Sequence, residues 1–119
     1  MNISEVTVGD LVLKETFYKD FRVGEIDVDD LFYGRISSYM PIPLTKGVLN
    51  EDFKEYRNGC YRLDFAEGIY INIDFLNEEP FVTIHNKSYY TCPICKYVHQ
   101  FQHALEVVGI NKNFVKFKL

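Results

Sequence analysis

The stretch CPICKYVHQFQHALEVVG, residues 92–109, carries the clearest helical pattern of the chain. Thr91 suits the N-cap position before it, and Gly109 suits the left-handed residue that ends a helix, with Ile110 placed to fold back on Leu105. One side of this predicted helix is apolar at the three- and four-residue spacing of a buried face: Ile94, Tyr97, Val98, Phe101, Leu105 and Val108. We therefore expect one amphipathic helix that packs on a sheet.

The other side of the predicted helix is polar. Its two histidines, His99 and His103, are four positions apart and would be neighbours on that side. We expect this polar helix face to meet solvent or a partner, and it comprises Lys96, His99, Gln102, His103 and Glu106.

The same stretch raises two alternatives because it holds two of the three cysteines. Cys92, Cys95, His99 and His103 are acceptable zinc ligands. Zinc fingers, however, separate their Cys pair from their His pair by about a dozen residues, and only three residues lie between the pairs here. The run TCPICK also resembles the CPxC site of glutaredoxins, where a helix N-terminus favours the thiolate. Glutaredoxins need a cis-proline strand and further helices after this motif, whereas ten residues follow Gly109. We expect two packed thiols, with no metal and no cofactor.

Three short motifs stand out: YVHQFQHAL at residues 97–105, PIPLT at 41–45 and VGD at 8–10. With any residue allowed in place of Phe101, they resemble motifs in a group of small uncharacterised proteins from prophages and mobile elements of Bacteroidetes. In that group the helix does not depend on a preceding CxxC. The resemblance implies a phage context and brings no established activity. Small phage proteins often modulate host machinery or inhibit host defence, as anti-CRISPR proteins do.

Length and composition predict one globular domain. The chain has 119 residues, 47% hydrophobic and 25% charged, and its 16% aromatic content favours strands. Two prolines make residues 41–47 an extended connector and a weak internal boundary. No apolar run approaches the roughly 18 residues of a membrane span, and residues 1–5 lack a signal-peptide pattern. We expect a cytoplasmic protein with reduced thiols, whose oligomeric state the sequence does not set.

Charge is unevenly distributed along the chain. The net charge of −4 argues against nonspecific binding of nucleic acid. Residues 1–85 sum to −8 and residues 86–119 to +4. The acidic part could dock on a basic groove of another protein. Its densest segment is predicted to be an exposed strand face with Glu25, Asp27, Asp29 and the adjacent Asp30.

The remaining patterns predict an α+β fold. In the first half, residues 8–12 resemble the first strand of SH3-like barrels, and residues 31–33 and 36–40 look like two short strands. Asn50 is expected to cap a short helix, Glu51 to Arg57, ended by Asn58-Gly59.

The second half reads as a β-meander followed by the helix and a final edge strand. Alternation over 61–65 and 69–75 around Glu67-Gly68 predicts a hairpin with one buried face, and strands follow at 81–85 and 88–91. After Gly109 a last strand would turn three side chains inward and three lysines outward: Val115, Phe117 and Leu119 inward, and Lys112, Lys116 and Lys118 outward.

The same sequence features favour some classes of function over others. The sequence has no phosphate-binding glycine loop, nucleophile elbow or His-Glu-x-x-His motif, so we expect no enzyme. We expect a phage-borne interaction protein that binds and inhibits or modulates a host protein or ribonucleoprotein complex, with an anti-CRISPR-like inhibitor as the most specific version. The alternatives are the thiol-redox or zinc-binding protein described above, and an RNA-binding accessory protein. The RNA-binding version would use the C-terminal lysines and four tyrosines: Tyr70, Tyr89, Tyr90 and Tyr97.

Overall fold

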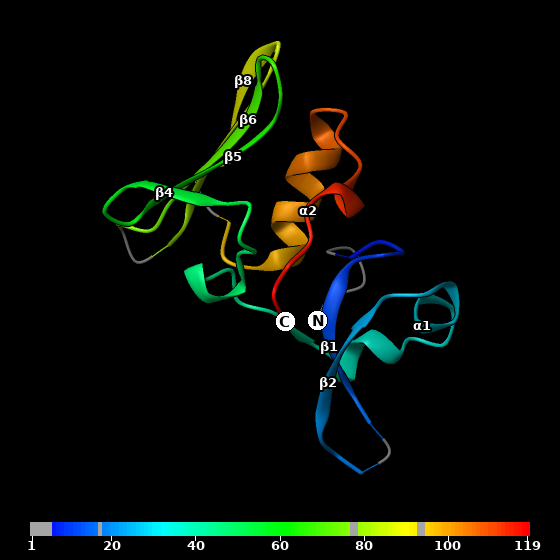
Figure 1. Cartoon of the computed structure of the whole chain (residues 1–119). Coiled ribbons are helices and arrows are strands. Elements are labelled where there is room, and N and C mark those ends of the chain that lie inside the picture. Colours follow the sequence, from blue (N-terminus) through cyan, green and yellow to red (C-terminus); the bar gives the residue numbers. More distant parts are fainter. Residues whose placement is uncertain (1–5, 17, 77–78, 93–94) are drawn as a thin grey trace. The chain divides into compact units, whose positions relative to one another are not determined.

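The computed structural model describes residues 6–16, 18–76, 79–92 and 95–119 (Figure 1). Two antiparallel sheets and two α-helices in this part of the chain confirm the α+β class. The chain divides into two compact units. Unit 1 comprises Met1–Pro43 and Tyr97–His99, and unit 2 comprises Leu44–Lys96 and Gln100–Leu119. The division after Pro43 falls inside the proline-containing connector, 41–47.

Unit 1 is built on a three-stranded sheet in the order β2-β1-β3. The strands are β1 (Leu11–Glu15), β2 (Phe21–Glu25) and the two-residue β3 (Met40–Pro41). Between β2 and β3 the chain forms helix α1 (Val28–Phe32) and the 3-10 helix η2 (Arg35–Ser38). The short strands predicted at 31–33 and 36–40 are therefore wrong, except for Met40.

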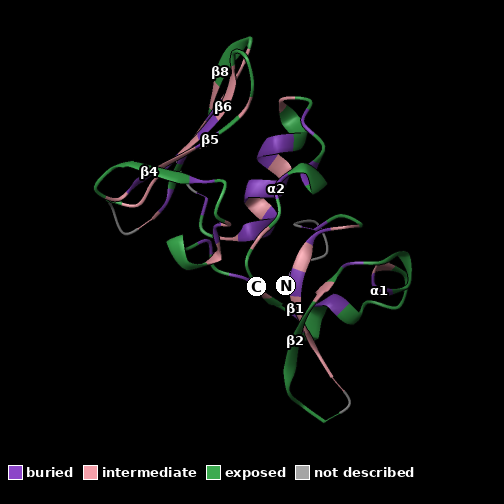
Figure 2. Cartoon of the chain, viewed as in Figure 1, coloured by how far each residue is buried: buried purple, intermediate pink, exposed green. Residues whose placement is uncertain are grey.

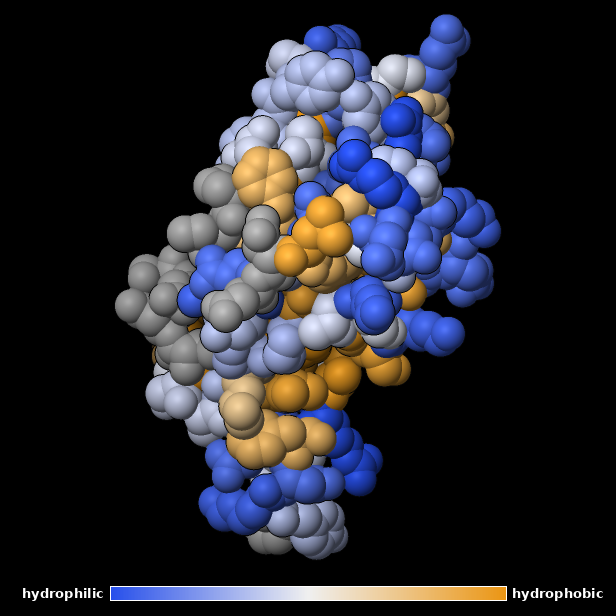
Figure 3. Space-filling view, turned by 90° about the vertical axis from the view of Figure 1, so that its left-hand side faces the viewer, coloured by the Kyte–Doolittle hydropathy of each residue, from blue (hydrophilic) through white to orange (hydrophobic). Residues whose placement is uncertain are grey.

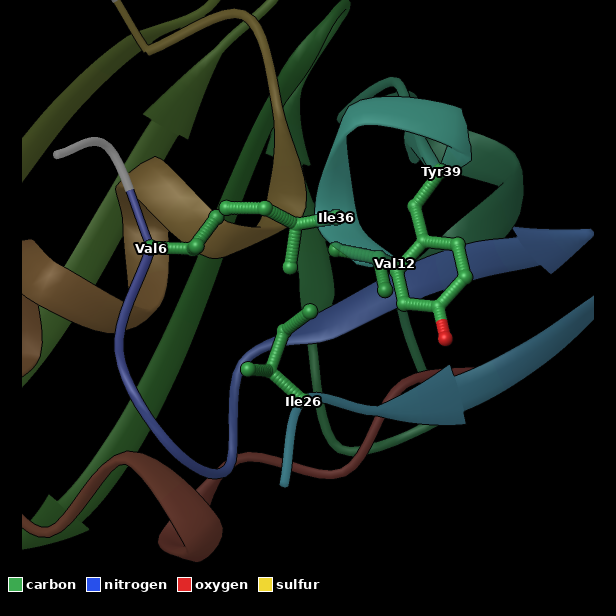
Figure 4. Packing of buried hydrophobic residues seen from close by; sticks show 5 residues of the cluster. All are labelled: Val6, Val12, Ile26, Ile36 and Tyr39. Atoms are coloured by element: carbon green, nitrogen blue, oxygen red, sulfur yellow. The ribbon is translucent and has the colours of Figure 1, made fainter. Parts of the chain in front are cut away.

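One face of this sheet forms the core of unit 1. Val12 on β1 is fully buried and packs with side chains from the segments around it, which Figure 4 shows converging on one point: Val6, Ile26, Ile36 and Tyr39. Leu31 of α1 covers the cluster from the helix side. The cluster joins β1 to η2, so the position of η2 is set by packing.

The acidic segment that was predicted as a strand forms helix α1 instead, and a capping box begins this helix. The Asp27 carboxylate accepts the Asp30 N–H at 2.7 Å, and the Asp30 carboxylate accepts the Asp27 N–H at 3.0 Å. Two backbone donors at the start of α1 are thereby satisfied, which favours a helix over a continued strand. The alternation of residues 25–29 therefore ends at Glu25. A strand would place Ile26 and Val28 together on its other face, but in the structure Ile26 is buried and Val28 is exposed.

Unit 2 is a five-stranded meander in sequence order, β4-β5-β6-β7-β8. Its strands are β4 (Lys54–Arg57), β5 (Cys60–Ala66), β6 (Ile69–Asp74), β7 (Phe81–Asn86) and β8 (Ser88–Cys92). The predicted hairpin, its turn and the two following strands are confirmed. The buried face is also confirmed, because the register aligns its apolar residues across three strands: Leu63, Ile71, Ile73, Val82 and Ile84.

The helix predicted at Glu51 to Arg57 is wrong. Asn50 does bond a backbone group, but its side chain accepts the Asp52 N–H at 2.8 Å in a turn. Asn58-Gly59 then forms the turn between β4 and β5, with Gly59 at φ 79°. Asn-Gly is a strong hairpin signal as well as a helix stop. Figure 2 shows β4 as an exposed edge strand.

Helix α2 (Val98–Val107) is shorter than predicted at its start. Thr91 is not its N-cap, because Thr91 and Cys92 belong to β8. The end is as predicted: Gly109 has φ 81°, and the Ile110 N–H donates to the Leu105 carbonyl at 2.9 Å. Three residues of the expected apolar side are buried, namely Val98, Phe101 and Leu105 (Figure 2). Tyr97 and Val108 are half-buried, and Ile94 lies outside the described residues.

The prediction of a final edge strand is wrong in its length, because only one bridge forms there. After α2 the chain forms a short 3-10 helix, η4 (Lys112–Phe114), and then makes a single bridge between Phe117 and Leu49. Val115 is buried as expected, but Leu119 is exposed and Lys112 is buried. None of the helices in the described part of the chain is long and apolar enough to cross a membrane.

Candidate functional site

The predicted polar helix face is only partly a surface. His99 and Gln102 are each 2% exposed, and His103 is half-buried. The His99 ring stacks on Tyr97 with 5.8 Å between centroids and 8° between planes. Lys96 and Glu106 are exposed, and the Lys96 ammonium lies 3.0 Å from the Glu79 carboxylate. The expectation of an exposed face is wrong for His99 and Gln102, because α2 is buried over more than one side.

The cysteine pair does not have the geometry of an activated thiol. Cys92 ends β8 and Cys95 lies in the connection before α2, so neither occupies the first turn of a helix. Burial, with a smaller contribution from the neighbouring Cys92, raises the pKa of the Cys95 thiol well above its usual range. Among the residues that the structure describes, no three His, Cys, Asp or Glu side chains gather to hold a metal ion. The alternative zinc set Cys92, Cys95, His99 and His103 is therefore not assembled.

The acidic segment separates into one buried and three exposed carboxylates. Glu25, Asp27 and Asp29 are exposed as expected. Asp30 is 2% exposed, so its assignment to an interaction surface is wrong. Its carboxylate accepts a hydrogen bond from the Lys14 ammonium at 2.6 Å and another from the Tyr39 hydroxyl at 2.7 Å. Asp30 is thus part of the framework of unit 1.

The pKa values of this network follow from its contacts. Burial by itself would raise the pKa of Asp30, but the hydrogen bonds from Lys14, Tyr39 and the Asp27 N–H outweigh it and lower the pKa to about 2. Burial and the bond to Asp30 raise the pKa of Tyr39 to about 12. The charged form of Asp30 and the neutral form of Tyr39 are therefore the ones that the fold stabilises.

The opposite face of the unit 1 sheet carries a row of apolar side chains. Leu13 pairs with Val23 on β2 and with Met40 on β3, so the three lie side by side. Phe21 lies two residues from Val23 on the same face. We call Leu13, Phe21, Val23 and Met40 the apolar strand row. Phe21, Val23 and Met40 are 41, 45 and 48% exposed. Figure 3 shows hydrophobic side chains at the surface on one side of the molecule, bordered by hydrophilic ones.

The apolar strand row lies in the acidic unit. Residues 1–43 hold four Lys and Arg and eight Asp and Glu, which amounts to the whole formal charge of −4. Unit 2 holds nine of each and is neutral. Two of the carboxylates border the row directly, because Glu15 pairs with Phe21 and Glu25 pairs with Leu11 on that face. The surface is thus apolar at its centre and has two carboxylates at its edge, of which Glu15 lies 3.8 Å from the Lys19 ammonium.

A second cluster lies on the outer face of the meander. Tyr70, His85 and Tyr89 are direct cross-strand neighbours on β6, β7 and β8. Tyr70 and His85 stack at 5.0 Å, His85 and Tyr89 meet at 4.6 Å, and the two tyrosine hydroxyls bond at 2.9 Å. The Arg62 guanidinium lies 3.9 Å from the centre of the Tyr70 ring. We call Arg62, Tyr70, His85 and Tyr89 the aromatic row.

The aromatic row gathers only part of the RNA-binding set expected from the sequence. Tyr70 and Tyr89 are in it, but Tyr90 pairs with Ile84 on the buried face and Tyr97 belongs to unit 1. Arg62 and His85 were missed as members. The strand alternation places Arg62, Tyr70 and His85 on one face, so the sequence pattern held a signal for them.

Comparison with known proteins gives no relative for this chain. No protein-family model matches it, and neither the curated proteins nor the solved structures contain a match.

Proposed function

We propose that the chain is a non-enzymatic interaction protein that binds a partner protein through the apolar strand row. The observation that carries the proposal is the pairing of Leu13, Val23 and Met40 on an open sheet face while Val12, on the other face, fills the core. A sheet needs only one apolar face to pack its own unit. Contiguous exposed apolar side chains typically mark an interaction site, and aromatic and Met side chains are enriched in such sites.

The partner would offer an apolar patch with basic residues around it. Glu15 and Glu25 at the edge of the row, within a unit of net charge −4, would steer such a surface toward it. In the phage context implied by the resemblance, the partner is a host protein or ribonucleoprotein complex that binding inhibits or modulates. A CRISPR effector with its basic nucleic-acid channel is one complex of this chemistry.

The test compares two valine variants with the same substitution. Tagged wild-type protein, Val23→Glu and Val107→Glu are used to capture partners from nuclease-treated host lysate. Val107 is exposed on α2 and lies outside the row. The charge placed in the row by Val23→Glu should raise the Kd for a captured partner by about 30-fold or more. The Kd of Val107→Glu for the same partner should equal that of the wild type. Equal binding of that partner by all three proteins would overturn the proposal.

The aromatic row favours a second candidate function, binding of single-stranded RNA. Tyr89 is 68% exposed, so its ring is open to a stacking base, and Arg62 lies in the same row. The test is fluorescence anisotropy of a short oligouridine with Tyr89→Ala and the exposed control Tyr18→Ala. Loss of one stacked base should weaken binding by roughly fivefold to a hundredfold. No binding by the wild type, or equal binding by both variants, excludes this function.

A further inference from the structure

A hollow of about 320 Å³ lies in unit 2, where the β5–β6 hairpin and the end of β7 approach the segment that follows α2. Its walls are mostly apolar, and they are formed by Phe65, Ala66, Ile69, Asn86, Gly109, Ile110 and Phe114. Phe65 and Phe114 meet edge to face, with 6.2 Å between ring centres. A hollow of this size and lining falls in the lower range of small-molecule sites.

One wall residue is polar and is held in a fixed orientation. Asn86 is the cross-strand neighbour of Ile69, so both side chains stand on the same face of the sheet. The Asn86 side-chain N–H donates to the Val108 carbonyl at 2.8 Å. Because a carbonyl oxygen only accepts, this bond fixes which end of the amide is nitrogen. Among the described residues, nothing donates a hydrogen bond to the other end, Oδ1.

We propose that this hollow binds a small, mostly apolar, planar molecule that carries one hydrogen-bond donor. The volume corresponds to roughly ten non-hydrogen atoms, taking about 30 Å³ for each water-sized group. The apolar walls would contact the body of the molecule, with Phe65 and Phe114 offering ring contacts. Its hydroxyl or N–H would donate to Asn86 Oδ1. The site shares no residue with the apolar strand row or the aromatic row, so it stands independently of the proposed function.

Indole and 1-methylindole are suitable probes for the full chain. They have the same ring system, but only indole has an N–H to donate to Asn86. The chain contains no Trp, so the fluorescence of the bound indole is not masked by the protein. We expect saturable indole binding with a Kd on the order of 1 mM, and roughly tenfold weaker binding of 1-methylindole.

Two leucine variants test the location of the site. Ala66 and Glu67 are neighbours and both are exposed, but only Ala66 lines the hollow. Ala66→Leu therefore adds side-chain volume to the wall, whereas Glu67→Leu makes the control change outside the lining. Indole should bind Glu67→Leu as it binds wild type and should bind Ala66→Leu at least fivefold more weakly. Circular dichroism checks that both variants fold. Absence of saturable indole binding, or equal binding to the two variants, overturns the site. Equal affinity for indole and 1-methylindole overturns the role of Asn86.

Discussion

The buried carboxylate of Asp30 makes the stability of unit 1 depend on pH in a defined window. The fold lowers the pKa of Asp30 from the ordinary value of 3.8 to about 2. A carboxyl group with a lowered pKa contributes stability above its unfolded pKa and loses that contribution as the pH falls through its folded pKa. For Asp30 the contribution is complete above about pH 4 and disappears toward pH 2. The change in pKa corresponds to about 2 kcal/mol.

Replacing Asp30 should remove this contribution at neutral pH. Asp30→Asn keeps an oxygen for the Tyr39 hydroxyl, but it loses the ion pair to Lys14 and the acceptor of the Asp27 N–H, which both involve Oδ2. We therefore expect unit 1 to lose about 2 kcal/mol in its free energy of unfolding. Lys14→Met should cost more than Asp30→Asn, because it leaves the Asp30 charge buried without its cation. The double variant should cost less than the sum of the two single variants.

Hydrogen exchange measures this effect within unit 1. The Ile26 N–H donates to the Asp10 carbonyl at 2.8 Å, and Ile26 belongs to the core of the unit. Its exchange at pH 7 should accelerate by about 30-fold in Asp30→Asn. The matched control is Asp29→Asn, an exposed carboxylate of the same helix that should change exchange very little. Similar exchange in the two Asp variants, or a wild-type stability that stays constant between pH 5 and pH 2, would refute the reasoning.

Two further predictions concern the end of α2 and the thiols. Gly109→Ala should lower the free energy of unfolding by about 1 kcal/mol in urea titrations, because φ is 81° and no atom lies within 4 Å of an added Cβ; no loss would contradict the left-handed conformation. Iodoacetamide should alkylate Cys92 in the native protein but modify Cys60 and Cys95 only in urea, since both are fully buried and burial raises the pKa of Cys95. Mass mapping after brief labelling checks this, and rapid native labelling of Cys95 would contradict it.

Local patterns predicted the parts of the fold that local interactions determine. The prediction of the hairpin around Glu67-Gly68 is confirmed, because the alternation of apolar and polar residues and the turn sequence both favour that structure. The closure at Gly109 was correct for a similar reason, since a single left-handed residue ends the helix.

Pairing between distant segments was what the patterns missed. Residues 96 and 97 have a helical pattern, yet they extend along the proline connector. The Leu44 N–H donates to the Lys96 carbonyl, and the N–H of Val98, the first residue of α2, donates to the Ile42 carbonyl, each at 2.8 Å. Pro43 also bridges to Tyr97. These contacts delay the start of α2, and no local signal encodes them. In the same way, β4 became a strand because β5 pairs with it.

The candidate site was harder to predict than the fold because polarity and exposure are not the same property. Asp30 stands in an acidic run that looks like a solvated surface, but Lys14 and Tyr39 compensate its charge inside the unit. The apolar strand row is the opposite case, because its side chains are apolar and yet partly exposed. Only the register shows that Val23 and Met40 share a face opposite Val12.

The burial of α2 bears on the role of the stretch YVHQFQHAL, residues 97–105. Its first residues group with unit 1 and the others with unit 2, so this helix takes part in both units. Its polar residues His99 and Gln102 are 2% exposed and cannot contact a partner from there. These two side chains therefore serve the fold of this chain and not an exposed binding surface. Partner choice would depend on exposed positions such as Val23 and Met40, which lie outside the motif and can differ between proteins without disturbing the core.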